Sequence, residues 1–453
     1  MATTITLTSP SAYQVFQRNS LGEADIRITG TYTGTVPASV EAQWGVGGWS
    51  VIDAAPEGGT FSGTLAGQVA GQGTLAVRDS GNTGVADSAA YVGIGDVFGV
   101  AGQSNASGRG ANHQSYNHAT LKAGMFRQDG QWRELADPSD IETHGVTPGG
   151  SAWPLLATRI MADQGVPVAF VTAPKGGSGL ANSTAEWNKL IGTYPAYNIF
   201  LDTVMQSGVN ELKAILWYQG EEEAADNPAT RSAYLTAINQ LIANFRADLG
   251  WDNLPLMAAQ PGHQANRTQT RGTIDGVRLA IMDAWESNSA ICAGPLTYDV
   301  DLSDAGGDSI HFITNAELTT LADRWWRNLE FVFYSGTDGR APKVSSVTLA
   351  SANSALVNFT VDVAPLINAG TGGWRITDNN GVLSISSAVI QADTVSVVVT
   401  ASTNFVGQAY LSYASGNDGV GATMTDSGTI PFPPEPIVDA LIVHPAAAAV
   451  WYW

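Results

Sequence analysis

A serine, a histidine and an aspartate in this sequence are of the residue types that nucleophilic catalysis needs. Ser104 follows the apolar run 97–101 in the stretch "DVFGVAGQSNASGRG". His311 lies in "GGDSIHF", with Asp308 three residues before it, so one turn of chain can place both side chains on the same side. A serine hydroxyl becomes a nucleophile when a histidine takes its proton and a carboxylate orients that histidine. The sequence therefore offers a candidate triad of Ser104 as nucleophile, His311 as base and Asp308 as orienting acid.

Each of these residues also has an ordinary structural interpretation. A serine after a strand is commonly a turn residue or a helix N-cap, and a lone histidine is commonly a surface or core residue. Asp308 has three competitors for the acid role in "YDVDLSD", namely Asp299, Asp301 and Asp304. The spacing from His311 favours Asp308.

Acyl transfer also needs hydrogen-bond donors for the negative oxygen of the tetrahedral intermediate. The backbone N–H groups of Ser104 and of a glycine in the Gly176-Gly177 turn can serve, because glycine lets the backbone approach a ligand closely. The side-chain amide of Gln219 can add another donor, and its structural alternative is an amide that braces a loop.

Strand–helix alternation across residues 94–336 can bring these distant residues together. The apolar strand candidates are "VFGVA", "VPVAFVTA", "LKAILWY", "LPLMAAQ" and "AICAG". Helical patterns lie between them, and "NAELTTLADRWWRNLEFV" closes the segment. This alternation predicts an α/β domain, a doubly wound parallel sheet covered by helices on both faces. Ligands bind at the carboxyl ends of such strands, where the sequence has residues 102–105, 175–179 and 219–221.

Two β-rich segments flank this α/β segment. Residues 1–93 show short alternating strands broken by glycine turns and predict an N-terminal β-sandwich domain. Residues 340–433 return to the same pattern and predict a second, C-terminal β-sandwich of the Ig/fibronectin-like kind. The proline-rich "PFPPEP" predicts an extended linker, and residues 434–453 are expected to form linker and tail.

The composition narrows the classes of partner. The chain has 453 residues, of which 44% are hydrophobic, and a formal net charge of -20. The acidity makes nucleic acid a poor partner, and the single cysteine, Cys292, cannot form an intrachain disulfide. No apolar run approaches the roughly 18 residues of a membrane span, so no membrane insertion is expected. The first residues lack the basic and apolar regions of a signal peptide, so none is expected.

Four blocks of the α/β segment together resemble one family. In the order "GQSN", "KGGSG", "WYQGE" and "DSIHF", they look like the sialate O-acetylesterase-like, carbohydrate acetylesterase branch of the SGNH hydrolases. The resemblance covers roughly residues 94–336 and implies an SGNH-type, flavodoxin-like catalytic domain. It implies the nucleophile role for Ser104 and the base role for His311, with Asp308 orienting the imidazole.

The same resemblance assigns residues around the triad. It implies that Gly177, with Gly176 next, donates to the oxyanion, and that Gln219 takes the place of an asparagine of the broader superfamily. It implies site support from Glu221, and we add Gln103 and Asn105, the neighbours of Ser104, as candidate supporting residues. Relatives often carry methionine where this chain has Ala106.

The resemblance implies a serine esterase that removes O-acetyl groups from carbohydrates, either acetylated polysaccharide or sialic acid, with no cofactor and no metal. The alternative class is a non-catalytic glycan-binding or attachment protein with a degenerate hydrolase domain, although the filled triad positions favour an enzyme. A lipase is a weaker alternative, since no long apolar lid adjoins the motifs. A phage-tail or cell-surface setting suits both main classes. Such a setting predicts an extracellular or virion-associated protein that belongs to an oligomer or a surface assembly. A cytoplasmic location is the remaining alternative.

Other residues that could carry chemistry have ordinary interpretations. The acidic triplet 221–223 is expected to be a solvated loop, and a metal site that joins it to His263 has no further support in the sequence. Trp153 and Trp187 could line a site, but helix packing is the preferred interpretation. The tryptophans at 325–326 and the terminal "WYW" are expected to pack rather than bind sugars.

Overall fold

A computed structural model describes residues 3–141, 149–182, 185–189, 195–225, 228–262, 271–302, 310–337, 339–416 and 418–443. The chain divides into two compact units. The first unit comprises residues 1–176, 194–217 and 242–256, and the second comprises residues 177–193, 218–241 and 257–453.

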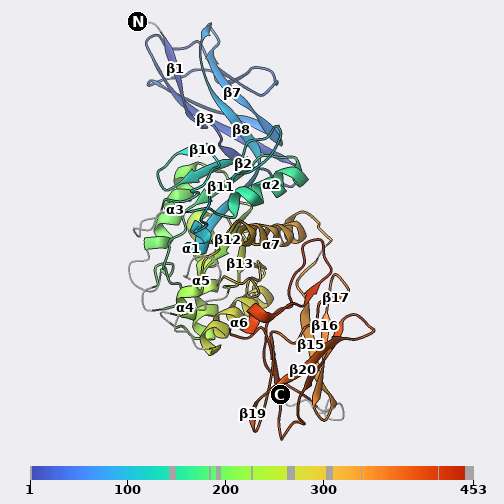
Figure 1. Cartoon of the computed structure of the whole chain (residues 1–453). Coiled ribbons are helices and arrows are strands. Elements are labelled where there is room, and N and C mark those ends of the chain that lie inside the picture. Colours follow the sequence, from blue (N-terminus) through green and yellow to red (C-terminus); the bar gives the residue numbers. More distant parts are fainter. Residues whose placement is uncertain are drawn as a thin grey trace. The chain divides into compact units, whose positions relative to one another are not determined.

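The first unit begins with β-strands and continues into alternating strands and helices (Figure 1). Its elements are β1 (Thr4–Ser9), β2 (Val15–Gln17), β3 (Glu23–Thr33), β4 (Val40–Trp44), β5 (Ser50–Asp53), β6 (Thr60–Val69), β7 (Gly71–Asp79), β8 (Asn82–Gly102), α1 (Ser104–Ser107), β9 (Gly124–Arg127), β10 (Trp132–Glu134), α2 (Trp153–Gln164), β11 (Val168–Thr172) and α3 (Pro195–Ser207). Three elements contribute residues to both units: β12 (Ala214–Tyr218), α5 (Arg231–Leu249) and β13 (Leu256–Ala259).

The second unit contains the remaining helices and a set of C-terminal strands. These are α4 (Glu221–Ala224), α6 (Arg271–Ser287), β14 (Ile291–Ala293), α7 (Asn315–Phe333), β15 (Lys343–Ser351), β16 (Ser354–Thr360), β17 (Leu366–Ile367), β18 (Trp374–Asp378), β19 (Gly381–Leu383), β20 (Ile385–Ile390), β21 (Ser396–Ala401), β22 (Tyr410–Tyr413), the 3₁₀ turn Asp418–Gly421, β23 (Thr425–Asp426) and β24 (Ile437–Leu441). The helical patterns predicted between the strands are confirmed as α2, α3, α5 and α6, and the predicted closing helix is confirmed as α7.

The N-terminal strands form two sheets around a shared apolar core. Strands β1, β3 and β6 make one sheet, and β4, β5, β7 and the first part of β8 belong to another. Along β3, buried and exposed residues alternate, as expected when one face of a strand meets a core. The core takes side chains from both sheets, among them Ile26, Ile28, Val40, Phe61, Leu75 and Val77. Burying each large side chain contributes about 1.5–3 kcal/mol.

A single long strand, β8, joins these N-terminal strands to the α/β part of the first unit. Its first residues alternate in burial and pair antiparallel with β7, whereas residues 92–102 are buried without interruption. This last part pairs in parallel with β11, with Asp96 opposite Val168 and Val100 opposite Thr172. Continuous burial indicates cover on both faces of the sheet. The strand therefore runs unbroken through the predicted boundary at residue 93.

Helices cover both faces of the sheet in the first unit, whose strands follow the order β10-β9-β11-β8-β12. Phe98 and Phe170 are register partners, and Phe170 contacts Trp153 of α2 at 5.9 Å between ring centroids. The next residue of β8, Gly99, faces Phe200 of α3, so that a Cβ atom there would lie 2.8 Å from the Phe200 ring. Successive strand residues point to opposite faces, so α2 and α3 lie on opposite faces. The predicted α/β fold is thus confirmed as a mixed α/β architecture with a large central sheet and further β-sheets. Because β10 runs antiparallel to β9, the sheet is not wholly parallel.

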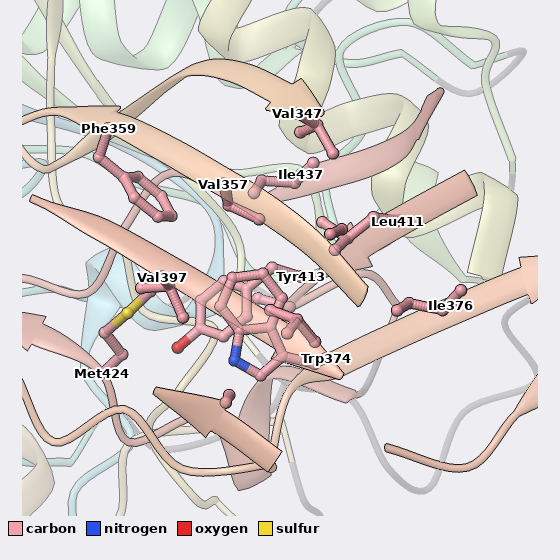
Figure 2. Close-up of a cluster of buried hydrophobic side chains, with 14 of the residues drawn as sticks. Val347, Val357, Phe359, Trp374, Ile376, Val397, Leu411, Tyr413, Met424 and Ile437 are labelled. Carbon is pink, nitrogen blue, oxygen red and sulfur yellow. The ribbon is translucent and has the colours of Figure 1, made fainter. Parts of the chain in front are cut away.

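The C-terminal strands of the second unit enclose their own apolar core. Their main sheets have the orders β15-β16-β21-β20 and β19-β18-β22-β24. Figure 2 shows side chains of both sheets meeting in this core, where the Trp374 and Tyr413 rings lie 4.4 Å apart. Leu296 and Tyr298, which follow β14, belong to the same cluster. The predicted tryptophan pair on α7 is also buried, as expected.

The segment "PFPPEP" is packed rather than extended into solvent. The Phe432 N–H donates to Asp426, and the Glu435 N–H donates to the Pro342 carbonyl. Strand β24 follows directly and pairs with β22. The segment that was expected to be linker and tail therefore contains a paired strand, and the side chains of Phe432, Pro433, Pro434 and Pro436 before it are buried. The terminal "WYW" lies outside the described residues.

Two helices of the second unit hold the C-terminal strands through buried charges. Arg327 of α7 forms a bidentate ion pair with Asp426 of β23, and neither side chain is exposed. Arg278 of α6 donates to the carbonyls of Ala414 and Gly416, and it also donates to Pro261 and Gly262 after β13. Among the described residues, no helix combines the length and the apolar character that a membrane crossing requires.

Candidate active site

Ser104 is the first residue of α1 and stands directly after the buried end of β8. Gly102 has a φ of +124°, a conformation that favours glycine, and its carbonyl accepts a hydrogen bond from the Lys175 N–H at 2.9 Å. The helix is braced by Trp153, whose indole N–H donates to the Ala106 carbonyl at 2.8 Å. Ser104 and its neighbours are buried, with Ser104 7% exposed. The first unit thus joins the "GQSN" block to the start of the "KGGSG" block.

Gly177 in the second block has a left-handed backbone. Its φ is +66°, and a Cβ atom there would meet nothing within 4 Å. The backbone conformation rather than crowding therefore favours glycine at this position. Gly176, the other predicted donor, precedes it in the first unit. Ser178 follows, and its hydroxyl accepts a hydrogen bond from the Trp187 indole at 2.7 Å.

Gln219 directly follows β12 and is fully buried. Its amide nitrogen donates to the Ser178 carbonyl at 3.1 Å and to Glu223 at 2.5 Å. Its amide oxygen accepts from the Tyr234 hydroxyl at 2.8 Å. Both amide hydrogens therefore have protein acceptors, which is the loop-bracing role. Donation by Gln219 to a reacting oxygen stays a prediction, and it would require one of these hydrogen bonds to open.

The acidic triplet 221–223 is not the solvated loop that its charge predicted. Glu221 and Glu223 are buried, and only Glu222 is partly exposed. The cause is the packing of α4 against α6, together with backbone donors for the Glu223 carboxylate from Leu180 and Ala181. Burial raises the pKa of Glu223 above its ordinary value. The supporting role of Glu221 stays a prediction.

The fourth block approaches the third block through an aromatic contact. Phe312, next to His311, meets the Tyr218 ring edge-on at 6.0 Å between centroids. Asp308 and Asp304 lie outside the described residues, so the acid role of Asp308 stays a prediction. Of the competing acids, Asp299 binds Arg324 with both oxygens, at 2.6 and 2.7 Å, and Asp301 is exposed.

Hydrogen bonds and ring contacts thus connect consecutive motif blocks along the chain. The first block contacts the second within the first unit, and the second contacts the third, and the third the fourth, within the second unit. The predicted supporting residues Gln103 and Asn105 are both buried beside Ser104. No group of three or more potential metal ligands occurs among the described residues, and His263 lies outside them.

Sequence reasoning missed the residues that brace these blocks. Trp153 and Trp187, assigned to helix packing, donate their indole N–H groups to the first and second blocks. Tyr234 and Glu223 orient the Gln219 amide. The indole and phenol groups could have been found by asking which buried polar groups near the motifs need a partner. The charge of Glu223 pointed away from burial.

Comparison with known proteins agrees with this architecture. Residues 94–325 match the family described as carbohydrate esterase, sialic acid-specific acetylesterase. The match spans half of the chain, so this protein belongs to that family of carbohydrate esterases, and its enzyme class is carbohydrate O-acetylesterase. A related sequence is the probable carbohydrate esterase At4g34215 of Arabidopsis thaliana. It is 27% identical over 241 residues, which cover 49% of this chain and 85% of that protein.

A solved structure extends the likeness beyond the matched segment. The carbohydrate acetylesterase XAC1771 of Xanthomonas citri is similar over 95% of this chain and 99% of that one. The TM-score is 0.67 at 18% sequence identity. At this identity the likeness shows a shared fold. That fold includes strands on both sides of the matched segment.

Proposed function

We propose that this carbohydrate O-acetylesterase works through Ser104 as nucleophile and His311 as general base, with Asp308 orienting the imidazole. The observation that carries the proposal is the series of contacts between consecutive motif blocks, which follow the ends of β8, β11 and β12 and precede α7. Family membership favours this enzyme over the non-catalytic attachment protein.

The proposed reaction has two acyl-transfer steps. Ser104 Oγ attacks the acetyl carbonyl carbon as His311 takes the hydroxyl proton. The oxyanion accepts hydrogen bonds from the N–H groups of Ser104 and Gly177. The sugar oxygen then leaves with the proton from His311, and an acetyl group remains on Ser104. Water attacks this ester with His311 again as base, which releases acetate and restores the serine.

The substrate is proposed to be a carbohydrate O-acetyl ester, on either a polysaccharide or a sialic acid. The family description names sialic acid-specific acetylesterases, and the similar protein from Xanthomonas citri is described as a carbohydrate acetylesterase. The β-sheet parts on both sides of the matched segment are proposed to serve attachment in an extracellular or virion setting. That proposal stands on architecture by analogy.

Acetate release tests the mechanism. Wild-type protein and Ser104→Ala would be assayed on p-nitrophenyl acetate and on a panel of acetylated xylans, bacterial polysaccharides and sialic acids. Ser107→Ala is the matched control, because this serine lies on the same short helix and donates to Asp140. We expect Ser104→Ala to lose release and Ser107→Ala to keep it. Equal release by wild type and Ser104→Ala would refute the proposed nucleophile.

A further inference from the structure

We propose that Glu223 is a positioning residue of this esterase. Its buried carboxylate fixes the loop after β11 and the amide of Gln219 in one arrangement. The inference rests on the proposed function, because it concerns how the N–H of Gly177 is held toward the oxyanion.

The carboxylate collects donors from two separate segments. One oxygen, Oε1, accepts from the backbone N–H groups of Leu180 and Ala181, the latter at 2.9 Å. The other oxygen, Oε2, accepts from Gln219 Nε2 at 2.5 Å. Glu223 is fully buried. Three N–H dipoles therefore converge on its two oxygens, and its only side-chain partner in these bonds is the amide of Gln219.

The same Gln219 amide returns to the loop that Glu223 holds. Gln219 Nε2 also donates to the carbonyl of Ser178, and its Oε1 accepts from the Tyr234 hydroxyl. Glu223, Gln219 and the segment from Ser178 to Leu180 thus close a ring of hydrogen bonds. Gly177, whose N–H is the proposed donor, directly precedes this ring.

A carboxylate suits this position better than an amide. A carboxylate only accepts hydrogen bonds, whereas a glutamine offers one accepting oxygen and one donating NH₂ group. Glutamine at position 223 could satisfy either the loop N–H groups or the Gln219 amide, but not both. The other would face a donor against a donor in a buried site, where an unmatched polar group is costly. The loop and Gln219 would then lose their shared anchor.

The test compares kcat with KM in matched variants. Glu223→Gln is expected to lower kcat on p-nitrophenyl acetate by about 10–10²-fold with KM nearly unchanged. The reason is that the oxyanion forms only in the transition state, and a displaced donor costs less than a deleted one. Glu223→Asp keeps the carboxylate and should recover part of kcat. Glu222→Gln removes the same charge one residue away, from a partly exposed side chain, and should match wild type.

Rates are expressed per active site, titrated with a serine-directed phosphonate, so that loss of folded protein does not lower the apparent kcat. If titrated Glu223→Gln keeps wild-type kcat while Ser104→Ala is inactive, the inference is wrong and the proposed function stands. If Ser104→Ala keeps its activity, the proposed function itself fails. If Glu223→Gln does not fold, Tyr234→Phe decides, since it removes the hydroxyl that orients Gln219 Oε1. A fall in kcat at constant KM supports the inference, and an unchanged kcat overturns it.

Discussion

The buried ion pair between Arg327 and Asp426 gives a quantitative test of how α7 holds the C-terminal strands. Arg327 donates to both oxygens of Asp426, at 2.9 and 2.5 Å, and also to the Ile430 carbonyl at 2.6 Å. Removing one partner of such a pair leaves an uncompensated buried charge, which costs about 3–5 kcal/mol. Arg327→Met should therefore lower the folded-to-unfolded ratio by about 10²–10⁴-fold.

This loss should appear in scanning calorimetry. For a unit of this size each kcal/mol moves the melting temperature by about 2–4 °C, so Arg327→Met should melt about 6–20 °C below wild type. The double variant Arg327→Met/Asp426→Asn carries no unpaired charge and should recover part of the loss. The oxygen of the introduced amide can still accept from the Gly428 and Phe432 N–H groups that Asp426 now binds. If the double variant loses as much stability as the two single variants lose together, the reasoning is refuted.

Three further changes test other parts of the structure. Burial raises the pKa of Glu435 to about 7, so the folded state holds this proton between about pH 4.3 and 7 and its stability falls as pH rises. Glu435→Gln should therefore melt above wild type at pH 8, by a difference that disappears below about pH 4. Burial alone would raise the pKa of Asp96. The hydrogen bonds and positive charges of Arg18 and Lys213 outweigh this effect, so the pKa of Asp96 is lowered. Asp96→Asn should therefore melt below wild type at pH 7, by a difference that shrinks below about pH 4. Gly177→Ala should fold, because a Cβ atom at this position meets no other atom within 4 Å. The variant should have a lower kcat, because an alanine in the left-handed conformation costs about 1–2 kcal/mol and favours a shifted position of the loop after β11.

Each of these outcomes has a control or a contradicting result. Equal melting of Glu435→Gln and wild type at pH 8 would contradict the raised pKa. If the melting temperature of Asp96→Asn stays below that of wild type by the same amount down to pH 3, the lowered pKa of Asp96 is contradicted. For Gly177→Ala the control is Gly165→Ala at the end of α2, where φ is +64° and space is also open. A similar kcat for both alanine variants would contradict a role for the Gly177 backbone.

The sequence predicted regular elements well where the apolar pattern was long. The five helices and the strands around the motifs stand near their expected residues, because period and burial agree there. The short strands β9 and β10 were missed, since three or four residues carry little periodicity. The unbroken course of β8 was missed because the hydrophobic pattern changes near residue 93, which indicated a domain boundary. In the structure the same strand continues, and only its burial changes, from one buried face to two.

The candidate site shows the same division between local pattern and three-dimensional contact. The places of the four blocks, three at or just after the ends of strands and one before a helix, could be predicted because those strands and that helix have recognisable patterns. The hydrogen-bonding of Gln219 could not, since it depends on Tyr234, Ser178 and Glu223 meeting in space. The burial of Glu223 was mispredicted because backbone N–H groups, which have no signature in the sequence, replace a cationic partner.

The most direct test of the proposed mechanism is to find the acetyl-enzyme. Wild-type protein would be mixed with p-nitrophenyl acetate, quenched in acid within the first turnover and digested for mass spectrometry. The mechanism predicts one acetyl group on the peptide that contains Ser104, located on that serine and absent from Ser107 of the same peptide. Acetate release with no acetyl group on Ser104, or with the acetyl group on another residue, would contradict it.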